Sequence, residues 1–182
     1  MSKKQREEGI VSDWNLLIKP ASSACNIDCR YCFYRDVAMS RETPFRGMMT
    51  DETLELLVRE AFRDASHFCG FNFQGGEPTV VGLNFYRQLV ELQRRYNQKG
   101  VQVQNAIQTN GYCIDEEWAA FLGENRFLIG LSLDEMCIRD SLYTKLCHPC
   151  LYQAEFSFIY EKFDLYRSLA ICFIRHRCLS HS

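Results

Sequence analysis

Along the first 134 residues, short runs of apolar residues alternate with segments in which apolar residues recur every three or four positions. Four short apolar runs predict β-strands, at residues 16–19, 70–74, 101–107 and 127–133. Between them, apolar residues three and four positions apart predict helices, at residues 54–65, 85–96 and 118–122. Thr50 and Asp115 precede two of these helices and are suitable N-cap residues. Strands that alternate with helices indicate right-handed βαβ units and a parallel sheet.

The predicted fold class is therefore α/β, a partial (βα) barrel with only about four βα units. A polar or glycine-rich motif stands at the end of each predicted strand: Cys25–Cys32, Gly75-Gly76-Glu77-Pro78, Gln108-Thr109-Asn110-Gly111 and Ser132. Chemistry in such barrels is found at the carboxyl ends of the strands. We therefore expect the four motifs to share one rim.

The first motif holds three cysteines, Cys25, Cys29 and Cys32, within eight residues. Three thiolates on a short loop can hold three irons of a [4Fe–4S] cluster and leave the fourth iron without a protein ligand. An open coordination position separates a reactive metal centre from a sealed structural one. The spacing alone leaves two other interpretations open, half of a zinc site and three ordinary thiols.

Composition narrows the classes of partner. The net charge of −2 does not predict a nucleic-acid or anionic-membrane partner. Residues 1–14 are a polar segment without the apolar core of a signal peptide, and no apolar run is long enough to span a bilayer. We therefore expect a cytoplasmic protein, in which cysteines are ligands or buried thiols rather than disulfides. Cys69 and Cys113 are interpreted as small core residues, and His67 as a surface residue.

Taken together, the motifs resemble those of radical S-adenosylmethionine (SAM) enzymes, and more closely the anaerobic sulfatase-maturating enzymes. The resemblance runs from about Asn15 to Asp134 and is carried by four segments: residues 17–23, 25–34, 73–79 and 108–111. It implies a radical SAM core domain over residues 15–134, truncated relative to the family. The implied cofactors are a [4Fe–4S] cluster and S-adenosyl-L-methionine.

The same resemblance implies roles for individual residues. Cys25, Cys29 and Cys32 would bind the cluster, and SAM would chelate the free iron. Gly75, Gly76 and Glu77 would receive the methionine amino group, because glycines allow close backbone approach and a carboxylate accepts from an ammonium. Phe33 and Tyr34 match positions near the adenine, and Ser132 matches a ribose contact. Gln74 and Gln108 would face the same cavity and touch either SAM or the substrate.

The implied reaction oxidises a cysteine or serine of a sulfatase polypeptide to Cα-formylglycine through a 5′-deoxyadenosyl radical. Its partners would be the sulfatase and an electron donor such as a flavodoxin or ferredoxin. The proton acceptor belongs to a part of the family's chain with no counterpart here, so no catalytic residue is assigned and the 182-residue chain is expected to be inactive. Three alternatives stay open: another peptide-modifying radical SAM maturase, a catalytically silent cluster-binding fragment, and a zinc-binding interaction module.

The pattern changes after Asp134. All ten glycines lie at or before Gly130, whereas five of the ten cysteines follow Asp134. The peptide Glu135–Ser141 matches a translation of the transposon end used to build sequencing libraries. Our hypothesis is that residues 135–182 are a non-native, irregular tail without its own fold. Cys147-His148-Pro149-Cys150 resembles a metal knuckle, but the tail lacks the length and glycine content of the family's auxiliary-cluster domain.

Overall fold

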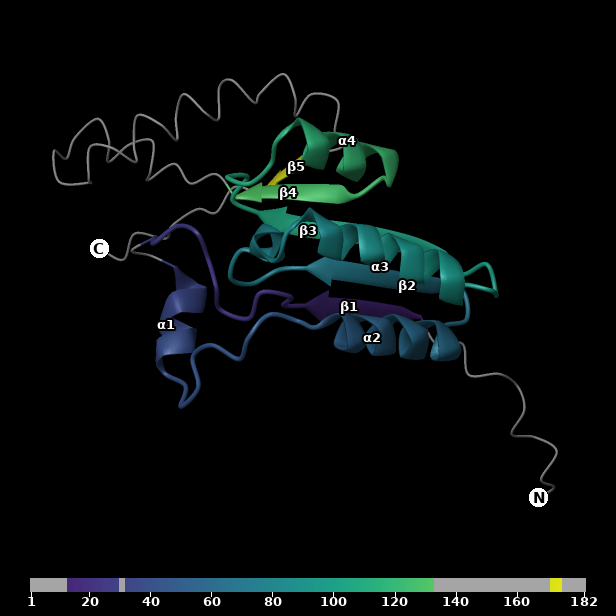
Figure 1. Cartoon of the computed structure of the whole chain (residues 1–182), viewed down its shortest axis with the longest axis horizontal. Helices are drawn as coiled ribbons and strands as arrows, with labels where there is room; N and C mark the ends of the chain where they lie inside the picture. The colour runs from purple at the N-terminus through teal and green to yellow at the C-terminus, as the bar shows by residue number, and fades with distance from the viewer. Residues whose placement is uncertain (1–12, 30–31, 133–170, 175–182) are drawn as a thin grey trace, which may run out of the picture.

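The computed structural model describes residues 13–29, 32–132 and 171–174. Its elements follow one another along the chain as shown in Figure 1: β1 (Trp14–Ile18), α1 (Phe33–Met39), α2 (Asp51–Asp64), β2 (Phe68–Phe73), the 3₁₀ helix η2 (Pro78–Val81), α3 (Leu83–Tyr96), β3 (Gln102–Thr109), α4 (Glu116–Glu124), β4 (Leu128–Ser132) and β5 (Ile171–Ile174). Strands and helices thus alternate as the apolar pattern predicts.

The strands form one sheet in the order β1-β2-β3-β4-β5, and every neighbouring pair is parallel. Because β1 to β4 are neighbours in the order of the chain, each crossover between them is a βα unit of the kind that builds barrels. Over the described residues the sheet stays open. The prediction of an α/β partial barrel is confirmed.

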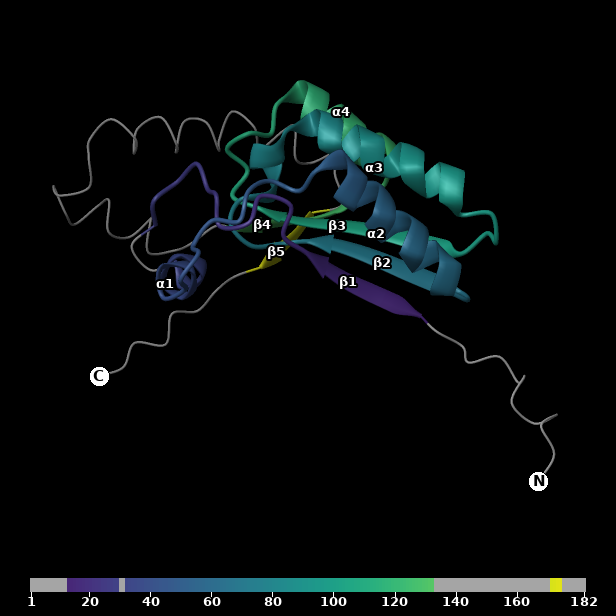
Figure 2. The ribbon, with the colours of Figure 1, turned by 60° about the horizontal axis from the view of Figure 1, so that its bottom comes forward.

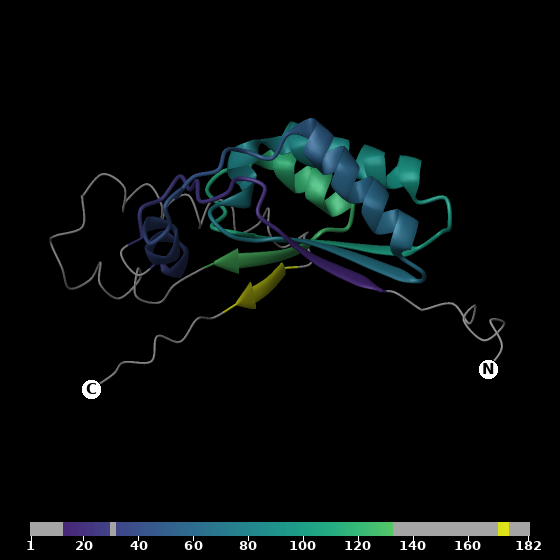
Figure 3. The same cartoon turned by 90° about the horizontal axis from the view of Figure 1, so that it is seen from below.

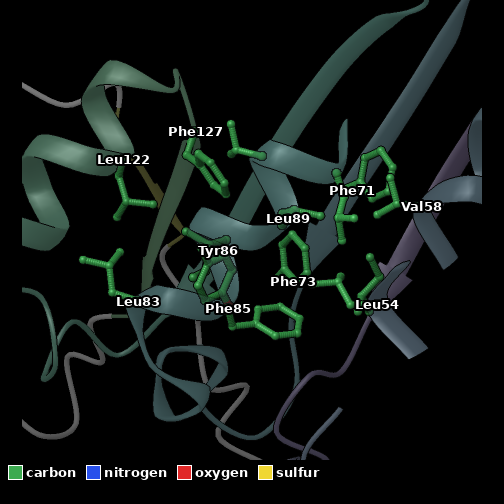
Figure 4. Packing of buried hydrophobic residues seen from close by; sticks show 14 of the residues in the cluster. Leu54, Val58, Phe71, Phe73, Leu83, Phe85, Tyr86, Leu89, Leu122 and Phe127 are labelled. Atoms are coloured by element: carbon green, nitrogen blue, oxygen red, sulfur yellow. The ribbon is translucent and has the colours of Figure 1, made fainter. Parts of the chain in front are cut away.

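Helices α2, α3 and α4 cover one face of the sheet, as Figures 2 and 3 show. The core lies between these two layers and is rich in aromatic rings (Figure 4). Tyr86 stands at its centre, fully buried, with the rings of Phe73 and Trp118 packed edge-on at centroid distances of 5.1 and 5.4 Å. Its hydroxyl donates to the carbonyl of Pro78 at 3.0 Å, so the one polar atom of the ring has a partner.

Helix starts follow local capping chemistry. The Thr50 hydroxyl accepts from the Thr53 N–H at 3.3 Å at the start of α2, and the Asp115 carboxylate accepts from the Trp118 N–H at 2.9 Å at the start of α4. Each contact satisfies one of the amide groups that a helix leaves unpaired in its first turn. Both predicted N-caps are confirmed.

The opposite face of the sheet carries polar side chains beside two exposed leucines, Leu17 and Leu128. It carries a hydrogen bond between Asn72 and Asn15 at 2.5 Å and another between Gln108 and Ser132 at 2.7 Å. Parallel sheets normally have both faces covered, since helices flank them. Helices α2, α3 and α4 all lie on the other face (Figures 2 and 3), so this face corresponds to the inside of an open barrel.

Two elements differ from the sequence-based expectation. Helix α1 was not predicted, because only Ala38 of its seven residues is buried and it therefore shows no apolar stripe. Strand β5 lies in the segment predicted to be irregular, and its four residues pair with β4. The physical reason is that an apolar run, Ile-Cys-Phe-Ile, can satisfy the exposed backbone edge of β4. The rest of the 135–182 tail lies outside the described residues.

No helix in the described part of the chain is both long and apolar enough to cross a membrane.

Candidate functional site

Three segments meet at the carboxyl ends of β1, β2 and β3: the cysteine loop, the Gly75–Pro78 loop and the Asn110 turn. The backbone N–H of Glu77 donates to the carbonyl of Ala24 at 2.8 Å, directly before Cys25. The N–H of Gln74 donates to the carbonyl of Ile18 at 3.0 Å. These two bonds place the loop after β2 against the loop after β1. The expected shared rim is therefore present for the first three motifs.

Both glycines of the Gly75–Pro78 loop have positive φ, +105° at Gly75 and +62° at Gly76. A Cβ on Gly76 would overlap the carbonyl oxygen of Ala24, and a Cβ on Gly75 would overlap the side chain of Lys19. Glycine is needed here for two reasons: the backbone conformation has positive φ, and neighbouring groups approach too closely for a side chain.

The Glu77 carboxylate points inward and is only 2% exposed. Its Oε1 accepts from the Thr79 N–H at 3.0 Å, the Thr79 hydroxyl at 2.6 Å and the Thr109 hydroxyl at 2.7 Å. Its Oε2 accepts from the Asn110 N–H at 2.8 Å. Three of the donors therefore share Oε1, and one is on Oε2. The carboxylate that the resemblance assigned to the methionine amino group is thus used by protein donors from η2, β3 and the turn after β3.

Asn110 connects that carboxylate to the cysteine loop. Its side-chain Nδ2 donates to Asn26 Oδ1 at 2.9 Å and lies 3.9 Å from Cys25 Sγ, within the longer reach of a hydrogen bond to sulfur. Its Oδ1 accepts from the Tyr112 N–H at 2.9 Å, which sets the orientation of the amide. Asn26 in turn donates to Cys113 Sγ at 3.3 Å. The loops after β1 and β3 are therefore joined by side-chain amides.

Cys25 is exposed, and Cys29 and Cys32 are half-buried, on the segment between β1 and α1. Desolvation and, less strongly, the charge of Glu77 raise the pKa of the Cys25 thiol. Within the part of the chain that the structure describes, no three Cys, His, Asp or Glu side chains are gathered closely enough to hold a metal ion. The three thiols share one loop without surrounding a common point. Their chemistry, three cysteine thiols within eight residues, still fits an iron–sulfur cluster.

Phe33 and Tyr34 begin α1, with their rings edge-to-face at 5.7 Å. The Lys19 ammonium lies 4.5 Å from the Tyr34 ring centroid, so the lysine bridges the Gly75 loop and α1. Burial and the neighbouring Arg41 lower the pKa of Lys19. Both cations, together with Arg46, line a hollow of about 440 Å³. Among the residues that the structure describes, its lining contains hydroxyls but no carboxylate, which favours anionic groups.

Gln108 and Ser132 come together on the polar face of the sheet. Gln108 is paired in register with Gly130, and a Cβ on Gly130 would overlap the Gln108 amide. The amide lies across that glycine and donates to the Ser132 hydroxyl at 2.7 Å. Ser132 is the last residue of β4, which agrees with its predicted position near the end of that strand. Gln74, half-buried, follows β2.

Sequence reasoning missed Thr109, Asn110 and Asn26 as parts of this site. Thr109 and Asn110 lay in a motif that had been singled out, but the pattern carries no signal of which partner each side chain takes. Cys113 was expected in the core and is instead half-buried beside Asn26, whereas the core position of Cys69 and the surface position of His67 are confirmed.

Comparison with known proteins places this geometry in a family. The profile described as the Radical SAM superfamily matches residues 20–150. A cysteine-type anaerobic sulfatase-maturating enzyme of Clostridium perfringens (strain ATCC 13124) is 52% identical over 120 residues, 66% of this chain and 32% of that protein. A serine-type anaerobic sulfatase-maturating enzyme of Klebsiella aerogenes is 40% identical over 124 residues, 66% of this chain and 29% of that protein.

Solved structures of a sulfatase-maturating enzyme have the same fold as this chain. A structure of polyhistidine-tagged anSMEcpe with bound AdoMet has a TM-score of 0.75 and 43% identity, and the match covers 90% of this chain and 42% of that one. A structure of native anSMEcpe with bound AdoMet and a Kp18Cys peptide has a TM-score of 0.74. The chain spans about a third of the length of the curated relatives it matches. By the profile match, the sequence identity and the shared fold, this chain belongs to the radical SAM superfamily.

Proposed function

We propose that this chain is part of a radical SAM enzyme that oxidises an active-site residue of a sulfatase to Cα-formylglycine. The observation that carries the proposal is the docking of the Gly75–Pro78 loop onto the cysteine loop through the Glu77 N–H and the Ala24 carbonyl. It holds the Gly75–Pro78 loop against the start of the cysteine loop, at the rim of a parallel sheet. The relatives named as cysteine-type and serine-type sulfatase-maturating enzymes support the same reaction.

In this proposal Cys25, Cys29 and Cys32 hold a [4Fe–4S] cluster. Gly75 and Gly76 would receive the methionine end of SAM through the backbone groups of their loop. The remaining contacts are Phe33 and Tyr34 at the adenine, Ser132 at the ribose, and Gln74 and Gln108 on the polar face of the sheet. When bound, the cluster and SAM supply the one-electron chemistry that removes hydrogen from a substrate carbon.

We further propose that the target residue is a cysteine. Identity is 52% to the cysteine-type enzyme of Clostridium perfringens and 40% to the serine-type enzyme of Klebsiella aerogenes, over spans of similar length. The structure of native anSMEcpe with bound AdoMet and a Kp18Cys peptide supports a peptide substrate. We also propose that a flavodoxin or ferredoxin supplies the electron and that the protein is cytoplasmic.

The family part of the chain is proposed to be residues 15–134, preceded by the polar segment 1–14 and followed by the non-native tail 135–182. The 120 residues aligned with the Clostridium perfringens relative equal the length of that central segment, which supports this division, although the superfamily profile ends later, at residue 150. Because the chain spans only 32% of that relative, we propose that it binds the cluster but does not complete the oxidation.

Anaerobic reconstitution of the 182-residue chain with iron and sulfide tests the cluster. We expect about four iron and four sulfide per chain, a brown product, and loss of both in Cys29→Ala. Cys69→Ala is the matched control, since Cys69 is fully buried in the core and should leave the iron content unchanged. Stoichiometric zinc without sulfide uptake would instead identify the zinc-binding interaction module.

The reaction itself is tested with SAM, dithionite and a cysteine-containing sulfatase peptide, followed by mass spectrometry. We expect no formylglycine from this chain and full conversion by the Clostridium perfringens relative under the same conditions. Formylglycine formed by the 182-residue chain would refute the proposed inactivity. A thioether crosslink in place of formylglycine would favour another peptide-modifying maturase.

A further inference from the structure

The Glu77 carboxylate is arranged as a structural support. It is 2% exposed, and it accepts four hydrogen bonds from protein groups: two from Thr79, one from Thr109 and one from Asn110. Two of these donors belong to the end of β3 and its turn, whereas the Glu77 N–H is bonded to Ala24 of the cysteine loop. One residue therefore links all three loops of the rim.

Asn110 carries that link to the first cysteine. Its backbone N–H is held by Glu77 Oε2, and its side-chain Oδ1 is held by the Tyr112 N–H. With both of these groups fixed, its Nδ2 hydrogens face the cysteine loop, where Nδ2 meets Asn26 Oδ1 at 2.9 Å and Cys25 Sγ at 3.9 Å. The amide thus presents a donor to the sulfur of Cys25 in an orientation set from β3.

We propose that Asn110 is a positioning residue that directs an N–H donor at the Cys25 sulfur, and that Glu77 holds Asn110 in place rather than binding SAM through its carboxylate. This inference rests on the proposed function, because it assumes that Cys25 is a cluster ligand. Donors to ligand sulfurs stabilise the more negative, reduced cluster and so raise its reduction potential. The reduction potential is therefore the property that Asn110 sets.

Redox titration of the reconstituted chain, followed by visible absorption and by electron paramagnetic resonance of the reduced cluster, tests this. Asn110→Ala removes the donor and should shift the midpoint potential to a more negative value. Glu77→Gln places an amide group against the Asn110 N–H, so it should shift the potential in the same direction. Because Glu77 acts through Asn110, the double variant should shift no further than Asn110→Ala alone.

Asn105→Ala is the matched control. Asn105 lies on the same strand, β3, but on the helix-covered face, where its side chain is bonded to Gln93 at 2.8 and 2.9 Å. This variant should lower stability without moving the potential. A potential and a resonance spectrum that stay unchanged in Asn110→Ala, or that move equally in Asn105→Ala, would overturn the proposal.

Asn110→Asp provides a second variant of the same shape, in which the donor becomes an acceptor. It should shift the potential to a more negative value than Asn110→Ala does. If both Asn110 variants lose the cluster while Asn105→Ala keeps it, the amide is required to place Cys25, which also supports the proposal. Failure of the unmodified chain to assemble a cluster would count against the proposed function instead, so the two failures are distinguishable.

Discussion

The side-chain amide of Gln108 donates a 2.7 Å hydrogen bond to the hydroxyl of Ser132 across the bare backbone of Gly130. The same arrangement occurs on the same face nearer the β1 edge, where Asn15 lies across Gly70 and accepts from Asn72. In both cases the partner lies two residues beyond the glycine. A glycine thus leaves room for an amide side chain of the adjacent strand to lie flat on the sheet and to form a hydrogen bond with the residue two positions beyond the glycine.

Gly130→Ala should displace Gln108, because the new Cβ would overlap the amide oxygen. The amide is the far end of a flexible side chain, so the fold should persist. We expect SAM binding to weaken by about tenfold, or about 1.4 kcal/mol, measured by anaerobic equilibrium dialysis on the reconstituted chain. Gly123→Ala, on the exposed end of α4, is the control and should leave the affinity unchanged. Equal affinity in the two variants would contradict the role given to Gly130.

Gly76→Ala should destabilise the rim for two reasons: φ is +62° and the Cβ would overlap the Ala24 carbonyl. Gly47→Ala is the control that separates the backbone strain from the overlap, since Gly47 has a φ of +87° and open space where a Cβ would lie. We expect a loss of about 1–2 kcal/mol in the control and a larger loss in Gly76→Ala, measured by urea unfolding. Equal losses would mean that the contact with the cysteine loop contributes nothing.

Asp115→Ala should cost about 1 kcal/mol, because the Trp118 N–H loses its acceptor at the start of α4. Asp115→Asn keeps a side-chain oxygen at the N-cap and should cost much less. Urea unfolding of the two variants side by side measures the difference. If asparagine is as destabilising as alanine, the charge of Asp115 rather than its hydrogen bond stabilises the helix.

Stability should fall at alkaline pH through Cys69. Burial raises the pKa of its thiol from 9.0 to about 11. Because the folded pKa lies above the unfolded value, the thiolate forms more easily in the unfolded chain. The stabilisation is therefore complete below about pH 9 and is lost as the pH rises through about 11. Urea unfolding across this range should show a steeper decline in the unmodified chain than in Cys69→Ala; parallel declines would exclude Cys69 as the cause.

Much of the fold could be predicted because its signals are local. The apolar spacing located β1 to β4 and α2 to α4, and the residues before α2 and α4 are N-caps for chemical reasons that act within about four positions. The sequence does not predict helix α1, because Ala38 is its one buried residue and it therefore lacks an apolar stripe. It does not predict β5, because the partner strand β4 lies about 40 residues earlier in the chain.

By itself, the sequence determined the alternation of strands and helices, the order of the motifs along the rim and the thiol chemistry of the cysteine loop, since each depends on neighbours in the chain. Only the tertiary structure decided that the Glu77 carboxylate faces Thr109 and Asn110, more than 30 positions away, and that Gln108 crosses Gly130 to reach Ser132. These contacts depend on strand register and on loop approach. A one-residue shift would turn each side chain to the other face of the sheet, so no local pattern could specify them.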